Sequence, residues 1–234
     1  MKRDLLSLAV NSNLHVRLID FYDSFTHNIV SELHHLEIKC QVIPIDRWHL
    51  LWSQGAYSQL GHENRREVII WGPGPGHPDD YLSKYNIVEM VDSLSQRKNI
   101  FQLGICLGHQ LIWRAFGVRS LKSDTPLHGG KVELKLPLWC DRSLKGTSQK
   151  IWVQRYNSLN LSYEDYTKLR DNQELVAKHG DLKLYFQSGE CLLGKFCRGI
   201  TYQFHPESVG TSYRSLFFRP VEKFLYNSND EDKG

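Results

Sequence analysis

The first half of the chain alternates short apolar runs with stretches of helical periodicity. Hydrophobic residues recur at helical spacing over Ser24–Leu36, over Tyr81–Leu94 and over Gln110–Phe116. The apolar runs between these segments predict strands over His15–Asp20, Cys40–Ile45, Glu67–Trp71 and Ile100–Gly104. Strands that alternate with helices are typical of a parallel sheet with helices on both faces, so the pattern predicts an α/β fold.

The second half of the chain alternates apolar and polar residues instead. This pattern predicts antiparallel strands that extend or cover the sheet, over Lys131–Leu136, Ile151–Val153, Glu174–Lys178, Leu182–Gln187 and Gly199–Phe204. Ser212–Tyr226 is predicted to be helical, with Pro220 kinking that helix or beginning a new one. We expect one domain over residues 14–226, preceded by an extension over 1–13 and followed by a polar tail over 227–234.

Composition and charge exclude several classes of protein. The chain has 234 residues, of which 41% are hydrophobic and 24% charged, as in a globular domain. Its 29 Lys and Arg residues and 26 Asp and Glu residues leave a formal charge of +3 without a basic stripe, so we expect no binding to nucleic acid. The initial apolar run, Leu5–Val10, is too short for a signal peptide, and no run approaches the roughly 20 residues of a membrane span.

The cysteines point to a reducing compartment. Their odd number, five, and irregular spacing argue against a disulfide framework, and the absence of a closely spaced pair argues against a metal site. We therefore expect a cytoplasmic protein with reduced thiols. Four of the five are interpreted as structural or incidental: Cys40, Cys140, Cys191 and Cys197.

Cys106 differs from the other four because of its position in a strand–turn–helix segment. It lies in Gly104-Ile105-Cys106-Leu107-Gly108, between an apolar strand and a helix. A nucleophile in such a turn stands on strained backbone, and the helix N-terminus favours its thiolate and offers N–H groups to an oxyanion. The alternative interpretation is a buried structural cysteine.

A thiol nucleophile needs a base and a group that orients the base. His205-Pro206-Glu207 follows an apolar strand, and Pro206 restricts His205 to an extended conformation. This arrangement could place Glu207 against one imidazole nitrogen while the other nitrogen faces the sulfur. Alone, the tripeptide would be interpreted as a surface turn.

A rigid loop follows the strand Glu67–Trp71. Gly72–Pro78 (GPGPGHP) alternates glycine and proline at the carboxyl end of that strand, where ligands bind in open α/β folds. Its backbone could supply a second oxyanion donor. It is not a phosphate loop, because no Gly-Lys-Ser/Thr follows, and the alternative is a stiff connecting turn.

These motifs resemble the class I (triad) glutamine amidotransferases, and among them the small subunits of anthranilate synthase and of para-aminobenzoate (aminodeoxychorismate) synthase. The resemblance runs in order from Val16 to Tyr226. Six segments carry it: Leu18–Asn28 (LIDFYDSFTHN), Gly72–Gly76, Gly104–Gln110, His128–Gly129, Arg155–Leu159 (RYNSL) and Gln203–Ser208 (QFHPES).

The resemblance implies a Rossmann-like, three-layer domain with a mostly parallel sheet and extra antiparallel strands. It implies that L-glutamine is hydrolysed to glutamate and ammonia, and that the ammonia passes to a chorismate-binding synthase subunit. Cys106 would be the nucleophile, His205 its base and then acid, and Glu207 the orienting carboxylate. The N–H groups of Gly74 and Leu107 would hold the oxyanion. Glutamine would be held by Gln110, Ser158, Leu159 and the loop Gly74-Pro75-Gly76. No cofactor is needed at this site, and any magnesium would belong to the synthase.

Three positions depart from the subfamily pattern. Asn157 stands where the pattern has histidine, and Gly72 where it commonly has serine. Gly129-Gly130 is one glycine longer than usual, in a loop that the resemblance places toward the synthase. None of these changes removes Cys106, His205 or Glu207. They do concern residues that the resemblance places near glutamine or the partner subunit, so those contacts are expected to differ from the subfamily pattern.

Two other hypotheses remain open at the level of sequence. One is a stand-alone thiol hydrolase of γ-glutamyl or peptide bonds, which would not need the glutamine-binding residues. The other is a non-catalytic regulatory subunit with the same fold, which the intact Cys106, His205 and Glu207 disfavour. The sequence does not choose between anthranilate and aminodeoxychorismate as the product, because that choice belongs to the synthase.

Overall fold

A mostly parallel sheet forms the centre of the molecule. The computed structural model describes residues 14–55, 60, 65–137, 139 and 150–226. Within these residues the sheet has seven strands in the order β2-β1-β3-β4-β9-β8-β7. The strands are β1 (Val16–Asp20), β2 (Cys40–Pro44), β3 (Glu67–Trp71), β4 (Ile100–Ile105), β7 (Lys183–Gln187), β8 (Glu190–Phe196) and β9 (Gly199–Tyr202).

The parallel part of the sheet combines the four predicted strands of the first half with β9 from the second half. The prediction of an antiparallel strand over Gly199–Phe204 is therefore right only in part, because β9 is antiparallel to β8 but parallel to β4. β1 pairs with β2 and β3, β3 with β4, and β4 with β9, all in parallel. β3 is buried at every residue and β4 at nearly every residue, because helices cover both faces of these strands. The predicted α/β architecture with a parallel sheet is therefore confirmed.

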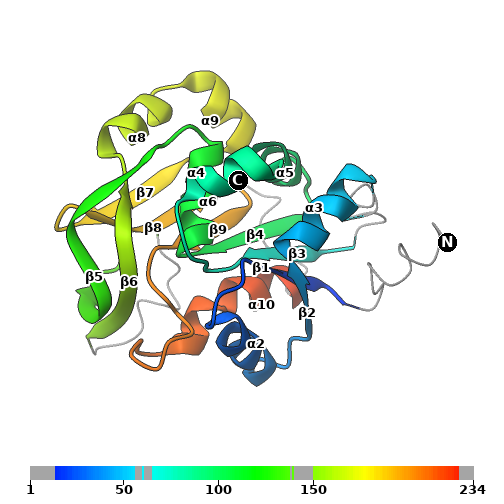
Figure 1. The fold of residues 1–234 in the computed structure, drawn as a ribbon, viewed down its shortest axis with the longest axis horizontal. Coiled ribbons are helices and arrows are strands. Elements are labelled where there is room, and N and C mark those ends of the chain that lie inside the picture. Colours follow the sequence, from blue (N-terminus) through cyan, green and yellow to red (C-terminus); the bar gives the residue numbers. More distant parts are fainter. Residues whose placement is uncertain (1–13, 56–59, 61–64, 138, 140–149, 227–234) are drawn as a thin grey trace.

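Helices cover the sheet on two sides (Figure 1). One side carries α3 (Ile45–Ser53), α5 (Ile87–Ser95) and α6 (Leu107–Ala115). The other side carries α2 (Thr26–His35), the 3₁₀ turn η2 (Arg214–Phe217) and α10 (Arg219–Tyr226). Each layer of helices buries its own apolar cluster against the sheet, and the result is a three-layer arrangement.

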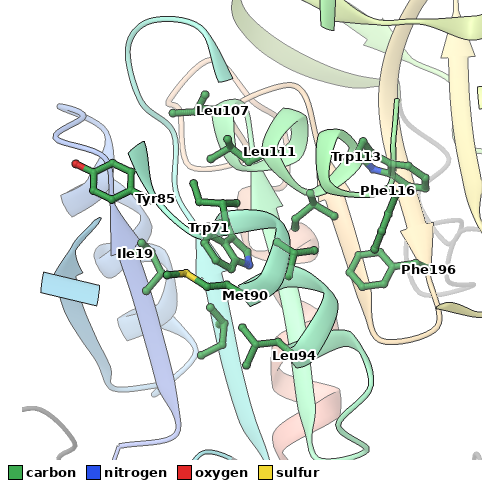
Figure 2. Packing of buried hydrophobic residues seen from close by; sticks show 14 of the residues in the cluster. Ile19, Trp71, Tyr85, Met90, Leu94, Leu107, Leu111, Trp113, Phe116 and Phe196 are labelled. Atoms are coloured by element: carbon green, nitrogen blue, oxygen red, sulfur yellow. The ribbon is translucent and has the colours of Figure 1, made fainter. Parts of the chain in front are cut away.

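The core beneath α5 and α6 is built around a tryptophan. Figure 2 shows Trp71 of β3 among Met90 and Leu94 of α5 and Leu111 of α6. The indole N–H of Trp71 donates to Oε1 of Gln102, 2.9 Å away, so the buried polar atom has a partner. This packing fixes the carboxyl end of β3 relative to the start of α6.

The antiparallel strands of the second half divide into two groups. β7 and β8 extend the central sheet beyond β9, and both pairs are antiparallel. A separate two-stranded sheet is formed by β5 (Ser120–Leu134) and β6 (Ile151–Leu161). It stands beside β7 and β8 at one end of the molecule (Figure 1). Both strands are longer than predicted, because the pairing continues through two irregularities.

The prediction of a strand over Glu174–Lys178 is wrong. These residues belong to α9 (Gln173–His179), which follows α8 (Tyr163–Arg170). The side-chain oxygen of Asn172 accepts hydrogen bonds from the backbone N–H groups of Glu174 and Leu175 and so begins a helix. This local cap outweighs the alternating pattern that suggested a strand.

The helix predicted over Tyr81–Leu94 is two helices. α4 (Pro78–Lys84) ends at Tyr85, which has extended backbone, and α5 begins at Ile87. The hydroxyl of Tyr85, the residue at which the chain turns between the two helices, donates to the carboxylate of Asp46 on α3. A helix at Pro220 is confirmed as a new one, since α10 begins at Arg219 with Pro220 in its first turn.

Helices α3 and α8 and strand β8 were not predicted. α3 starts directly where β2 ends, so its first residue, Ile45, was assigned to the end of a strand. The extension 1–13, the tail 227–234 and Cys140 lie outside the described residues.

Candidate active site

The carboxyl ends of the parallel strands meet at one edge of the sheet, and Cys106 lies there between β4 and α6. Its backbone has φ 52° and ψ −102°, a left-handed conformation that costs a non-glycine residue about 1–2 kcal/mol. Its N–H donates to the carbonyl of Tyr202 on β9, 2.8 Å away, which holds the turn in place. The side chain is 8% exposed. A strained cysteine therefore stands at a helix N-terminus, as the motif predicts.

Close packing explains the two glycines that flank this turn. A side chain at Gly104 would come within 2.8 Å of the carbonyl oxygen of Gly108, and one at Gly108 within 1.9 Å of the carbonyl oxygen of Trp71. The N–H of Gly108 donates to the carbonyl of Gly72, 3.1 Å away. The glycines thus let α6 start directly against the end of β3 and its loop.

The segment after β9 brings His205 and Glu207 together. Nδ1 of His205 lies 2.7 Å from Oε1 of Glu207, and the two residues are 2% and 1% exposed. The backbone N–H of His205 donates to the carbonyl of Gln154 on β6, 2.9 Å away. The predicted contact between the imidazole and the carboxylate is present.

Two aromatic rings enclose the imidazole of His205. Phe25 lies 4.8 Å and Tyr156 5.1 Å from it between ring centroids. Phe25 is placed by the turn after β1, in which the hydroxyl of Thr26 and the N–H of Tyr22 both donate to Asp20. The opening motif of the chain therefore supports the histidine. Phe25 and Tyr156 were not singled out from the sequence, although both lie inside quoted motifs.

Charge partners decide the protonation of His205. Burial alone disfavours an imidazolium, but the neighbouring Cys106 sulfur and the Glu207 carboxylate outweigh it and raise the pKa of His205 well above its ordinary value. A cationic imidazole between a sulfur and a carboxylate is the arrangement of an activated thiol.

The Gly-Pro loop lies against the start of α6. A side chain at Gly74 would come within 2.6 Å of Cδ2 of Leu107 and within 2.5 Å of Cβ of Phe21. Gly74 therefore packs directly against the side chain of Leu107, and both residues carry an expected oxyanion donor. The hydroxyl of Tyr81 on α4 donates to the carbonyl of Pro75, 3.0 Å away, and Gly76 has φ 81°.

A chain of amide contacts leads from Cys106 to the expected glutamine-binding residues. Nε2 of Gln203 lies 3.8 Å from Sγ of Cys106, and Oε1 of Gln203 accepts from Nε2 of Gln110 at 3.0 Å. Gln110 also contacts the carbonyl of Leu159 at 3.5 Å. Gln203 was not predicted as a site residue. Its signal was a polar residue in the otherwise apolar run before His205.

The remaining described cysteines differ from Cys106 in setting. Burial raises the pKa of Cys40 to about 11 and also raises the pKa of Cys191. Partial desolvation raises the pKa of Cys197, although that residue is exposed. None of the three stands at a positive φ. Their setting fits a passive role.

The extra glycine of the Gly129-Gly130 segment forms a β-bulge. β5 pairs His128 with Tyr156 and Gly130 with Arg155, so Gly129 is the additional residue on its strand. Gly129 has φ 84°, and its carbonyl accepts from the side-chain amide of Gln154 at 2.9 Å. The additional residue is absorbed locally and leaves the pairing on both sides intact.

The described part of the chain holds neither a metal-binding cluster nor a membrane-spanning helix. No group of three or more His, Cys, Asp or Glu residues in it is arranged to hold a metal ion. No helix among these described residues combines the length and apolar character needed to cross a membrane.

Comparisons with known proteins show what the chain is similar to. The family model "Glutamine amidotransferase class-I" matches residues 17–224. Anthranilate synthase component 2 of Helicobacter pylori is 29% identical over 195 residues, covering 82% of this chain and 88% of the relative. Its counterpart from Saccharolobus solfataricus is 30% identical, covering 86% and 94%. A Thermoplasma acidophilum structure, solved as a candidate GMP synthase component, has a TM-score of 0.66 at 19% identity, covering 92% and 94% of the two chains, and shows the same fold.

Proposed function

The chain belongs to the class I glutamine amidotransferase family, and from this premise we propose that Cys106, His205 and Glu207 hydrolyse L-glutamine to glutamate and ammonia. The observation that carries the proposal is the strained Cys106 turn lying against the buried His205–Glu207 pair. A thiol beside a cationic imidazole whose far nitrogen is held by a carboxylate has the three parts that acyl transfer to sulfur requires.

In the first half of the reaction, the Cys106 thiolate attacks the side-chain amide carbon of glutamine. The imidazolium of His205 then gives its proton to the departing nitrogen, the C–N bond breaks, and ammonia leaves a thioester on the sulfur. Glu207 keeps the imidazole in the orientation in which Nε2 faces the sulfur.

In the second half, His205 acts in the opposite direction. As the neutral base it takes a proton from water, and the hydroxide attacks the thioester carbon. The C–S bond breaks, glutamate leaves, and the thiolate and imidazolium are restored. The N–H groups of Gly74 and Leu107 stabilise the oxyanion of both steps. Leu107 is the first residue of α6, whose first N–H groups have no partner within the helix, and Gly74 offers its N–H from the loop after β3.

The rest of the substrate would be held by residues next to the thiol. The proposal assigns this role to Gln110, to the backbone of Ser158 and Leu159, and to the loop from Gly74 through Pro75 to Gly76. The contact between Gln110 and the carbonyl of Leu159 supports the assignment, since it joins two of these elements across different parts of the fold.

We further propose that the ammonia passes to a chorismate-binding synthase subunit, with anthranilate as the product. Support comes from the relatives named anthranilate synthase component 2, each of which matches most of this chain. The resemblance of the six motifs to the small subunits of chorismate-using synthases supports the kind of partner but does not bear on the product. The synthase is expected to complete the glutaminase site, so the isolated chain should hydrolyse glutamine poorly.

Copurification of the synthase and identification of the product made from chorismate test this proposal. With Cys106→Ser, product formation from glutamine should be lost, whereas product formation from added ammonia should survive. Cys197→Ser is the matched control, because Cys197 is exposed and should change neither activity. Full glutamine-dependent synthesis by the Cys106 variant would refute the mechanism, and aminodeoxychorismate as the product would refute the choice of partner.

A further inference from the structure

The side chain of Asn157 is buried on β6, and both ends of its amide are engaged. Oδ1 accepts a hydrogen bond from Nε of Arg155 at 2.9 Å, and Nδ2 donates to the carbonyl of Leu159 at 2.9 Å. Asn157 is 2% exposed. The position is therefore occupied by a buried amide with a partner at each end rather than by a loosely placed polar side chain.

The chemistry of the partners fixes the orientation of this amide. A guanidinium Nε only donates, so the atom that faces it must be the oxygen. A backbone carbonyl only accepts, so the atom that faces Leu159 must be the amide nitrogen. Both ends demand the same orientation, and a flipped amide would lose both hydrogen bonds.

Arg155 is itself held in place by a buried ion pair. Its guanidinium lies 2.6 Å from Oε2 of Glu190, and both side chains are 4% exposed. Oε1 of Glu190 accepts from the hydroxyls of Ser123 and Thr125 on β5. Arg155 thus offers its Nε to Asn157 from a fixed position.

The backbone that Asn157 holds lies at an irregularity of the β5–β6 sheet. The register pairs Leu127 with Asn157 and Lys122 with Leu159. Four residues of β5, Ser123 to Pro126, therefore lie opposite the single residue Ser158, which stands outside this register. A regular ladder would fix the peptide planes around Ser158, but here the side chain of Asn157 supplies the hydrogen bond.

The carbonyl of Leu159 connects this irregularity to the thiol. It accepts from Asn157 and also contacts Gln110, whose amide binds Gln203 beside Cys106. The peptide that Asn157 orients is thus one of those assigned above to glutamine binding.

We propose that Asn157 is a positioning residue for glutamine, which sets the Ser158–Leu159 backbone through its hydrogen bond to the Leu159 carbonyl. The inference rests on the proposed glutaminase function and deepens it. Asn157 keeps this backbone in its binding conformation without contacting the sulfur. Because an amide does not titrate, the positioning is independent of pH in the range where an imidazole would change its charge.

Asn157→Asp removes only the donor end of the amide. The remaining carboxylate still accepts from Arg155 but presents an oxygen to the carbonyl of Leu159. Asn160→Asp is the matched control on the same strand. Asn160 also bridges two backbone groups, donating to the carbonyl of Gly189 and accepting from the N–H of Cys191, both at 2.8 Å, but it does so away from the thiol.

The measurement is the rate at which iodoacetamide alkylates Cys106 in the complex with the copurified synthase, followed by mass spectrometry of the Cys106 peptide. Without glutamine, this rate measures the reactivity of the Cys106 thiol. With increasing L-glutamine the rate falls, and the concentration at which it is halved is the half-protection concentration. For Asn157→Asp we expect the half-protection concentration to rise about tenfold, with the glutamine-free rate unchanged. Asn160→Asp should change neither quantity.

Asn157→His supplies a second readout. A neutral imidazole has one donor and one acceptor nitrogen and can serve both partners, whereas an imidazolium faces Arg155 with a second cation. At about pH 8, the glutamine concentration for half-protection of this variant should be near the wild-type value. At about pH 6 it should be higher than at about pH 8, and the wild-type concentration should rise less over the same range. This variant carries the test if Asn157→Asp does not fold.

Three results would overturn the inference. An equal half-protection concentration of L-glutamine in Asn157→Asp and Asn160→Asp would show that the Leu159 contact does not position glutamine. A parallel loss of the glutamine-free alkylation rate would show a structural role that extends to the thiol. Absence of glutamine protection in the wild type would overturn the proposed function itself, and the inference with it.

Discussion

The imidazole of His205 donates through Nδ1 to Oε1 of Glu207 across 2.7 Å, and neither side chain is more than marginally exposed. The carboxylate fixes which nitrogen carries the proton and leaves Nε2 for the sulfur of Cys106. It also offsets the cost of a buried imidazolium, which burial alone would disfavour. The carboxylate of Glu207 therefore both orients the imidazole of His205 and stabilises its positive charge.

Replacing Glu207 by glutamine should remove both contributions while preserving size. We expect glutamine-dependent turnover to fall by about 10²- to 10⁴-fold, because the amide can offer an N–H to Nδ1 and favour the wrong tautomer. Ammonia release in the complex with the synthase is the measurement. Glu164→Gln serves as control, since Glu164 is exposed on α8 and pairs with Lys168 one turn away. Equal turnover in the two variants would exclude an orienting role.

The raised pKa of His205 predicts a specific dependence of stability on pH. The native state holds this proton more tightly than the unfolded chain does, so the stabilisation is complete below the unfolded value of about 6.5. It is lost as the pH rises through the higher native value. Cys106→Ala removes one of the two groups that raise this pKa, so the loss should begin at lower pH in the variant.

Thermal unfolding of the wild type and of Cys106→Ala between about pH 6 and pH 9 measures this difference. The comparison between variants cancels His109, which is buried and contributes with the opposite sign because burial lowers its pKa to about 3. Parallel curves for the two proteins would show that the sulfur does not act on the charge of His205.

The parallel half of the fold was predictable because its strands are buried on both faces. The runs that end in Trp71 and Ile105 have no alternative to a central strand, and the turn residues after them mark the edge where the site forms. The sharp turn around Cys106 was predictable because Gly104 and Gly108 are required by contacts closer than a Cβ permits. Local spacing in the sequence reflects these contacts directly.

Features that depend on distant contacts were not predictable. The break between α4 and α5 lies at Tyr85, whose hydroxyl donates to Asp46, 39 residues away in the sequence. Gln203 joins the site through Gln110, 93 residues away. The role proposed for Asn157 likewise rests on its hydrogen bonds, whereas the sequence showed only a departure from the family pattern.

Gly108→Ala should be strongly destabilising for a steric reason. The added Cβ would lie 1.9 Å from the carbonyl oxygen of Trp71, which is backbone and cannot move aside without separating α6 from β3. We expect a loss of more than about 3 kcal/mol in the free energy of unfolding. Gly189→Ala is the control: it has φ 81° but no atom within 4 Å of the added Cβ, so it should cost only about 1–2 kcal/mol. Urea denaturation measures both, and similar losses would contradict the steric account.

The hydroxyl of Tyr81 should matter to turnover more than to stability. It donates to the carbonyl of Pro75 at 3.0 Å, and the ring packs edge-on against Phe21, which in turn lies against Gly74. Tyr81→Phe keeps the ring and removes only the hydrogen bond to the loop that carries Gly74, the proposed oxyanion donor. Loss of one such bond corresponds to a reduction of about tenfold in kcat, with little change in the KM for glutamine if the bond acts on the oxyanion.

Tyr163→Phe is the control, because Tyr163 is 61% exposed and packs against other rings away from the thiol. A raised KM with unchanged kcat would instead assign the Pro75 carbonyl to ground-state binding of glutamine.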